Sequence, residues 1–75
     1  MEVEDLLMGE ECLIRLDQFL KVKGLVGSGG EAKVLIREGA VKLNGEVETR
    51  RRKQLFEGDR VEFNGEIFDV REPLD

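Results

Sequence analysis

The chain has 75 residues, of which 40% are apolar and 39% charged, and its 12 Lys and Arg against 17 Asp and Glu give a net charge of −5 at pH 7. A chain of this length folds as one small domain with a thin core, which leaves little room for a deep enzyme pocket, and its apolar content excludes a disordered polar tail. The longest uncharged stretch, residues 24–30, is short and rich in glycine, so we expect neither a membrane span nor a signal peptide, and a cytoplasmic location.

The first elements are expected before residue 24. Residues 1–11 are acidic and weakly patterned, which indicates a flexible arm. An apolar run over residues 12–14 predicts a short N-terminal strand, with Cys12 as a small apolar residue at its start rather than a reactive thiol. Three apolar residues then recur at helical spacing: Leu16, Phe19 and Leu20. We predict a first helix over residues 15–23, ended by Gly24.

The second helix has clear start and stop signals. Ser28 and Glu31 have the spacing of a capping box, in which the Ser28 hydroxyl accepts from the Glu31 amide and the Glu31 carboxylate accepts from the Ser28 amide. Three apolar residues supply the buried stripe: Ala32, Leu35 and Ile36. Because Gly39 is a natural end, we predict a helix between Ser28 and Gly39.

After Gly39 the apolar period changes to two, which predicts a β-hairpin. Its first strand alternates apolar, charged and apolar residues: Val41, Lys42 and Leu43. Asn44-Gly45 supplies a type I′ turn, and Val47 lies on the returning strand.

A second hairpin is predicted over residues 61–67, which repeat the pattern of the first around another Asn-Gly pair. Residues 57–59 form the turn before it. Residues 49–54 are expected to be a connecting loop between the hairpins. Pro73 marks the end of regular structure, so residues 72–75 are expected to be a tail.

Positive charge is concentrated in the middle of the chain. Residues 21–53 hold nine Lys and Arg against four Asp and Glu, whereas the two flanks together hold three against thirteen. Phosphate groups respond to the field of a local patch over about a Debye length, roughly 8 Å at physiological salt. The positive middle can therefore bind a polyanion that the whole-chain charge would repel.

The sharpest cluster is the run of four cations Arg50, Arg51, Arg52 and Lys53. Adjacent cations repel one another and indicate an anionic partner, although a solvated connector paired with Glu46 and Glu48 explains an isolated run equally well. Lys33 and Arg37 favour the first interpretation, because they lie four residues apart on one face of the second helix and outside its apolar stripe.

Gly29 and Gly30 at the start of the second helix have two interpretations. They either let the chain turn sharply, or leave the first-turn amides bare to bind phosphate. The pattern is neither a Walker A loop nor a dinucleotide fingerprint.

Aromatic residues and catalytic side chains are scarce. The four rings all fall on apolar positions and are expected in the core, which disfavours stacking on unpaired bases: Phe19, Phe56, Phe63 and Phe68. With no histidine and one cysteine, the chain offers no pair of nucleophile and base, and its carboxylates lack the clustering of a metal site. We therefore predict no enzyme activity, no cofactor and no bound metal.

Motifs spaced over roughly residues 13–70 resemble those of the S4 domain, an RNA-binding module named after ribosomal small-subunit protein four. They are Arg15-Leu16-Asp17-Gln18-Phe19-Leu20, Ser28 with Ala32, Leu35-Ile36-Arg37-Glu38-Gly39, Val41-Lys42-Leu43-Asn44-Gly45 and Glu57-Gly58-Asp59-Arg60-Val61. The resemblance implies an α+β fold, the αL RNA-binding motif, in which two helices pack on a small, mainly antiparallel sheet in the order α-α-β-β-loop-β. It assigns residues 12–71 to this domain.

Residues 28–33 and 48–53 look like the stand-alone YbcJ/YaaA-type subfamily. The common family pattern has an Arg where this chain has Gly29, so other cations would take over that phosphate contact. The resemblance implies binding of structured RNA, ribosomal or transfer RNA, through the face of the second helix and the following loop. We expect a monomer, with the ribosome as a further partner. The implied RNA-binding residues are Arg15, Lys33, Arg37, Lys42, Arg50, Arg51, Arg52 and Lys53.

Two alternatives stay open. Arg15 either extends the basic surface, or pairs with Asp17, or has a role at the start of the first helix. A function of a different class is that of an adaptor, which would dock on ribosomal or RNA-processing proteins through its acidic flanks, residues 1–11 and 62–75.

Overall fold

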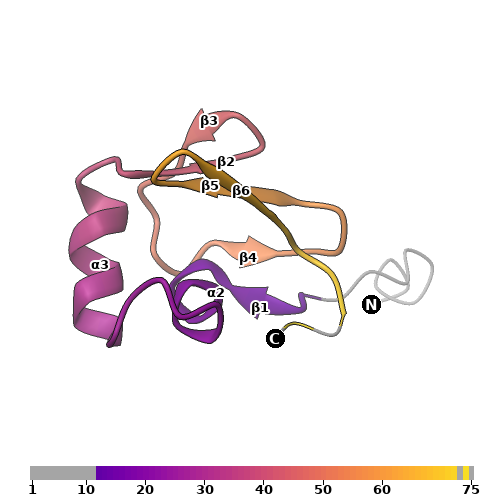
Figure 1. Cartoon of the computed structure of the whole chain (residues 1–75), viewed down its shortest axis with the longest axis horizontal. Helices are drawn as coiled ribbons and strands as arrows, with labels where there is room; N and C mark the ends of the chain where they lie inside the picture. The colour runs from indigo at the N-terminus through magenta and orange to yellow at the C-terminus, as the bar shows by residue number, and fades with distance from the viewer. Residues whose placement is uncertain (1–11, 73, 75) are drawn as a thin grey trace, which may run out of the picture.

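The structure, a computed structural model, describes residues 12–72 and Leu74. It contains the helices α2 (Leu16–Val22) and α3 (Gly29–Arg37) and the strands β1 (Ile14–Arg15), β2 (Val41–Leu43), β3 (Glu46–Val47), β4 (Gln54–Leu55), β5 (Arg60–Phe63) and β6 (Glu66–Asp69). The four strands of the two hairpins, β2, β3, β5 and β6, make one antiparallel sheet in the order β3-β2-β5-β6, while β1 and β4 pair separately. In Figure 1, α2 and the β1–β4 pair lie on one side of the sheet, and α3 stands at one end.

This architecture confirms the expected α+β fold, including the N-terminal strand. The expected acidic arm, residues 1–11, lies outside the described residues, as does Pro73. Cys12 is exposed and precedes β1, with its Sγ 3.4 Å from the Ile14 carbonyl oxygen, so the prediction that it enters the strand was wrong. None of the residues that the structure describes lies in a helix long and apolar enough to cross a membrane.

Both helices end where the glycines predicted. Gly24 and Gly39 have φ of +74° and +83°, a conformation that side chains with a Cβ rarely adopt. Beyond each glycine an amide returns to the last turn: Leu25 N–H donates to the Leu20 carbonyl at 2.9 Å and Ala40 N–H to the Leu35 carbonyl at 3.0 Å. These bonds satisfy carbonyls that the helix itself leaves unpaired.

The start of α3 differs from the predicted capping box by one residue. The Ser28 hydroxyl accepts from the Glu31 N–H at 3.2 Å, as expected. The Glu31 carboxylate, however, accepts from the Gly27 N–H at 2.9 Å rather than from Ser28. The Glu31 carboxylate therefore satisfies the amide that precedes the N-cap residue, and not the amide of Ser28 itself.

Both Asn-Gly pairs form the predicted hairpin turns. Asn44, Gly45, Asn64 and Gly65 all have positive φ, between +53° and +89°, as type I′ turns require. The turn before β5 is also present, with Gly58 at φ +99° and the Asp59 N–H donating to the Phe56 carbonyl at 3.0 Å. These turns set the register of the sheet.

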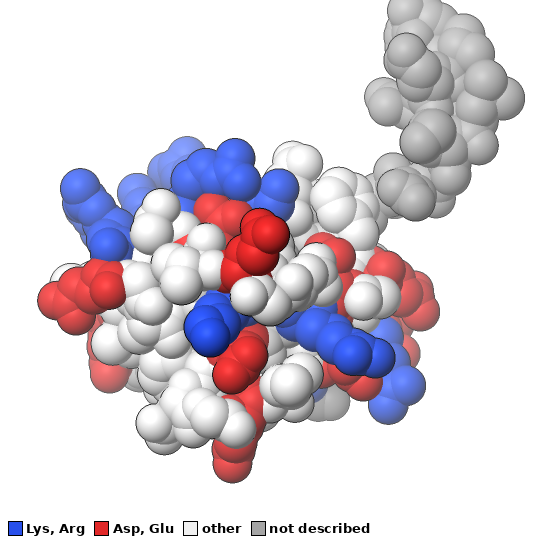
Figure 2. Space-filling model, turned by 90° about the horizontal axis from the view of Figure 1, so that it is seen from above, with Lys and Arg blue, Asp and Glu red and all other residues white. Residues whose placement is uncertain are grey.

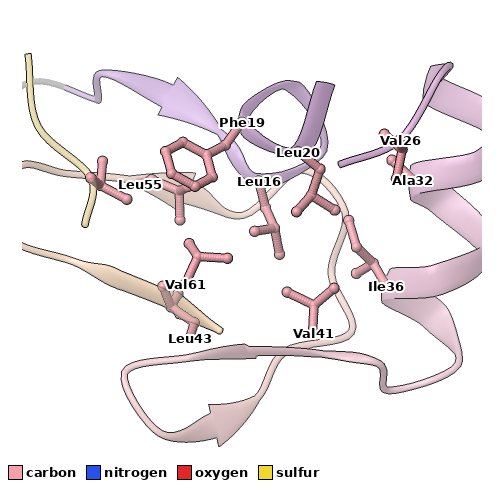
Figure 3. Packing of buried hydrophobic residues seen from close by; sticks show 11 residues of the cluster. Leu16, Phe19, Leu20, Val26, Ala32, Ile36, Val41, Leu43, Leu55 and Val61 are labelled. Atoms are coloured by element: carbon pink, nitrogen blue, oxygen red, sulfur yellow. The ribbon is translucent and has the colours of Figure 1, made fainter. Parts of the chain in front are cut away.

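The core lies between the helices and one face of the four-stranded sheet (Figure 3). Fully buried side chains from both helices meet those of the strands: Leu16, Phe19, Leu20, Ala32, Ile36, Val41, Leu55 and Val61. Of the four rings that were expected in the core, only Phe19 is fully buried. Phe63 and Phe68 are half-buried and pack against the cluster. Phe56 is half-buried and is not part of it.

β4 is the main element that the sequence analysis missed, since residues 49–54 were expected to be a loop. Gln54 and Leu55 pair with Arg15 and Ile14 of β1. A strand of two residues is too short to show an alternating pattern. Its pairing nevertheless fixes one end of the basic run, and so bears directly on the candidate site.

Candidate nucleic-acid interface

The basic loop, residues 50–53, is held at the N-terminal end of α2. The Leu16 N–H donates to the Lys53 carbonyl at 2.9 Å, and the Asp17 N–H donates to the Arg51 carbonyl at 3.0 Å. The first amides of a helix have no hydrogen-bond acceptor within the helix. The carbonyls of the loop accept from these amides, and the same bonds fix the backbone of the loop. In Figure 1 the connection from β3 to β4, which contains this loop, runs on the same side of the molecule as α3.

Asp17 is the buried charged residue at this junction, with a side chain only 11% exposed. Its Oδ1 accepts from the Gln18 N–H at 2.8 Å, and its Oδ2 lies 3.7 Å from Arg51 Nη1. Arg15 Nε lies 3.8 Å from Oδ1. Arg15 therefore pairs with Asp17, and this shared carboxylate brings Arg15 next to Arg51.

Arg50 pairs with Glu48, as the connector interpretation expected for part of the run. Arg50 Nε and Nη2 donate to the two Glu48 oxygens at 2.8 and 3.2 Å, and the Arg50 N–H donates to the carboxylate at 3.0 Å. These hydrogen bonds hold the pKa of the Glu48 carboxyl below its ordinary value, although burial acts in the opposite direction. The same side-chain bond raises the pKa of Arg50. The charge of Arg50 is thus locally compensated.

The other cations of the middle segment are less constrained. Within residues 12–72, no carboxylate lies within 4.0 Å of the side-chain nitrogens of Lys33, Arg37, Arg52 or Lys53. Three of these residues are exposed, and Lys53 is half-buried. Figure 2 shows Lys and Arg side chains gathered along one edge of the face seen from above, whereas both signs of charge are mixed over the rest of that face.

The structure separates Lys42 from this group. Val41 and Leu43 are buried, so the alternation of β2 directs Lys42 to the outer face of the sheet, away from the helices. Its partners in the register are Val47 on β3 and Glu62 on β5. A carboxylate therefore lies directly across from Lys42 on the adjacent strand.

Gly29 and Gly30 begin α3 without a steric reason for glycine. Neither has positive φ, and a Cβ added at Gly29 would meet nothing within 4 Å. The interpretation that they permit a sharp turn therefore loses support. Among the hydrogen bonds of the described residues, neither amide has an acceptor, which leaves the phosphate interpretation as an expectation.

The sequence analysis missed two residues of this region. Asp17 was considered only as a partner of Arg15, yet it also holds Arg51. An isolated carboxylate beside the apolar Leu16, in the first turn of a helix, was the available signal. Phe56 was placed in the core, but it lines an open hollow beside the basic loop. No local pattern could distinguish it, because β4 itself was not predicted.

Known proteins are similar to this chain over most of its length. A family model described as "S4 domain" matches residues 9–71. The Escherichia coli (strain K12) protein named "Putative RNA-binding protein YbcJ" is 40% identical over 63 residues, which are 84% of this chain and 90% of that protein. The Bacillus subtilis (strain 168) protein named "Probable ribosome maturation protein RlbA" is 43% identical over 53 residues, 71% of this chain and 75% of that one.

A solved structure, "Crystal structure of pseudouridylate synthase", superposes with a TM-score of 0.69 and 30% sequence identity. The match covers 79% of this chain but only 25% of the synthase chain. The similarity is thus to one part of a larger protein, and it supports the fold. With a family model that spans most of its length and relatives of matching size, the chain belongs to the S4 domain family.

Proposed function

We propose that this chain is a non-catalytic protein that binds structured RNA, ribosomal or transfer RNA, as a monomer. Residues 12–71 form the binding domain. The surface consists of the basic loop with Arg15, together with Lys33 and Arg37 on α3. Membership of the S4 domain family supports this proposal, as do the names of two relatives, one an RNA-binding protein and the other a ribosome maturation protein.

The observation that carries the proposal is the attachment of the basic loop to α2. Two backbone hydrogen bonds, from Leu16 and Asp17, fix the loop, so the backbone that carries the adjacent cations is held in place before any partner binds. A preorganised loop loses less conformational entropy on binding than a flexible one. Arg52 is exposed, and no carboxylate of the described residues pairs with it, which leaves its guanidinium available to a phosphate.

The test is charge reversal at positions that do not hold the loop together. Arg52→Glu combined with Lys33→Glu removes two proposed phosphate contacts and leaves the Asp17–Arg51 contact intact. Arg51 is unsuitable, because a carboxylate there would face Asp17. Arg71→Glu is the matched control, since Arg71 is exposed and follows β6, outside the proposed surface.

Binding would be measured by fluorescence anisotropy with purified transfer RNA and with ribosomal RNA. We expect the double variant to bind at least about tenfold more weakly than the wild type at physiological salt, and the control to bind within about twofold of it. A decrease in log K in the control that is half as large as that in the double variant would show that only net charge matters, because the control reverses one charge and the double variant reverses two. The adaptor hypothesis instead predicts unchanged capture of a protein partner by the double variant.

A further inference from the structure

The open hollow beside the basic loop is large enough for a small ligand. Its volume is about 460 Å³, and its lining includes Phe56, Gln54 and the two loop cations Arg50 and Lys53. Sites for small ligands are commonly about 300 to 1,000 Å³ and combine an apolar surface with a few polar groups. Arg50 and Lys53 belong both to the hollow and to the basic loop. One RNA molecule could therefore contact the loop and place a group in the hollow.

Phe56 has no evident role in the core. It directly follows β4 and buried Leu55, it lines the hollow, and it lies outside the buried cluster that Phe63 and Phe68 join. Its backbone is fixed, because the Phe56 N–H donates to Asp59 Oδ2 at 2.9 Å while the Asp59 N–H donates to the Phe56 carbonyl at 3.0 Å. A positioned, half-exposed ring is a surface on which a base stacks.

Most of the carboxylates around the hollow are already engaged. Both oxygens of Glu48 accept from Arg50. Asp59 Oδ2 accepts from the Phe56 N–H, and Asp59 Oδ1 accepts from Asn44 Nδ2 at 3.2 Å. The polar groups that remain are the Lys53 ammonium, the Gln54 amide and the exposed Glu46 carboxylate. A cation suits a phosphate, whereas an amide and a carboxylate suit the edge of a base.

We propose that this hollow binds one unpaired nucleotide, whose base stacks on Phe56 and whose phosphate contacts Lys53. The inference rests on the proposed function and makes it more specific. The RNA that this chain recognises carries an unpaired nucleotide, such as a bulge, next to the helical segment that the basic loop contacts. Recognition then combines phosphate contacts, which position the RNA, with a contact to one base.

The first test is an NMR titration with the four nucleoside 5′-monophosphates, with ribose 5-phosphate as a probe that lacks a base. We expect ring-current shifts of the Phe56 ring protons and shifts of the Lys53 and Gln54 amides with the nucleotides, and no shift of the ring with ribose 5-phosphate. Identical shifts with both kinds of probe would overturn the proposal. The proposal would also be overturned if the Phe56 ring responded to arginine amide but not to any of the nucleotides. That result would identify the hollow as a site for a cationic protein partner.

The second test uses two RNA hairpins that differ only in a single-nucleotide bulge in the stem. We expect the wild type to bind the bulged hairpin about fivefold or more tightly than the paired one, and Phe56→Leu to lose this preference. Phe68→Leu is the matched control, because its half-buried ring packs on the core instead; it should keep the preference. Amide spectra would verify that both variants are folded.

The two hairpins also separate this inference from the proposed function. If the wild type binds both hairpins equally and Phe56→Leu changes neither affinity, the nucleotide site is refuted while RNA binding stands. If the wild type binds neither hairpin, nor transfer or ribosomal RNA, the proposed function fails as well.

Discussion

Asp17 and Arg51 are joined both through the backbone and through their side chains: the Asp17 N–H donates to the Arg51 carbonyl at 3.0 Å, and Asp17 Oδ2 lies 3.7 Å from Arg51 Nη1. The Asp17 carboxylate also accepts from the Gln18 N–H and lies near Arg15. A single buried acidic residue thus helps to hold the basic loop, together with the bond from the Leu16 N–H to the Lys53 carbonyl. Arg15 and Arg51 are therefore not simply exposed charges, because the Asp17 carboxylate at the start of α2 lies close to both of them.

Asp17→Asn should destabilise the protein more than the same change at a surface pair. The variant leaves Arg15 and Arg51 without their shared negative charge, and we expect the free energy of unfolding to fall by about 1 kcal/mol, measured by urea denaturation. Asp69→Asn is the matched control: its oxygen also lies 3.7 Å from an arginine, Arg60, but its side chain is 54% exposed. Asp69→Asn should lower the free energy of unfolding by less than about 0.5 kcal/mol. Equal costs would contradict the role of burial.

Stability should depend on pH through Glu48. Because its pKa is lower in the folded state, the carboxylate contributes stability that is fully present above the unfolded pKa, about 4.3, and is lost as the pH falls through the lower folded value. Glu48→Gln should therefore lose less stability than the wild type between about pH 5 and pH 3. Urea unfolding at several pH values measures this difference.

Arg50→Gln tests the cause of that shift. It removes the side-chain bonds at 2.8 and 3.2 Å that favour the charged form of Glu48, so the pKa of Glu48 should rise toward its ordinary value. An NMR titration of the Glu48 side-chain carboxyl carbon would show the change. An unaltered pKa in this variant would mean that the Arg50 side chain is not the cause.

The elements that the sequence predicted well are those fixed by neighbouring residues. Helix ends at Gly24 and Gly39 and turns at Asn44 and Asn64 depend on backbone conformations that few other residues adopt. The run of cations and the positive face of α3 were equally visible. These features need no knowledge of distant parts of the chain.

What could not be predicted depends on contacts between distant segments. The pairing of β4 with β1 lies directly beside the point where the basic loop meets the start of α2. The contact between the basic loop and the start of α2 places Arg51 beside Asp17. Phe56, at the end of β4, lines the open hollow. The sequence indicated a basic surface, but not which of its cations are paired with carboxylates, because that distinction is a matter of tertiary structure.

RNA binding should weaken steeply with salt. If about five phosphates are contacted in largely duplex RNA, a fourfold increase in salt should weaken binding by roughly 10²- to 10³-fold. Arg52→Gln should lower the slope of log K against log salt by about 0.9, because one phosphate contact is lost. Arg71→Gln should leave the slope unchanged. Affinities measured by anisotropy over a salt series provide the test, and a salt-independent affinity would contradict a phosphate-based interface.

The two faces of the molecule should differ in their effect on RNA affinity, and Lys33 and Lys42 allow the comparison. Both are exposed lysines, so each can be changed to glutamine with the same loss of charge and little effect on the core. Lys33 lies on α3, with Arg37 one turn further along the same face. Lys42 lies on the outer face of the sheet, across from Glu62, where a nearby carboxylate opposes the approach of a phosphate.

We therefore expect Lys33→Gln to weaken binding to transfer or ribosomal RNA by about threefold or more, and Lys42→Gln to change it by less than about twofold. Anisotropy titrations of both variants at one salt concentration would measure the difference. A loss in Lys42→Gln as large as that in Lys33→Gln would extend the RNA-binding surface across the edge of the sheet. Such a result would also require Glu62→Gln to strengthen binding, since removal of the opposing carboxylate would raise the local positive potential around Lys42.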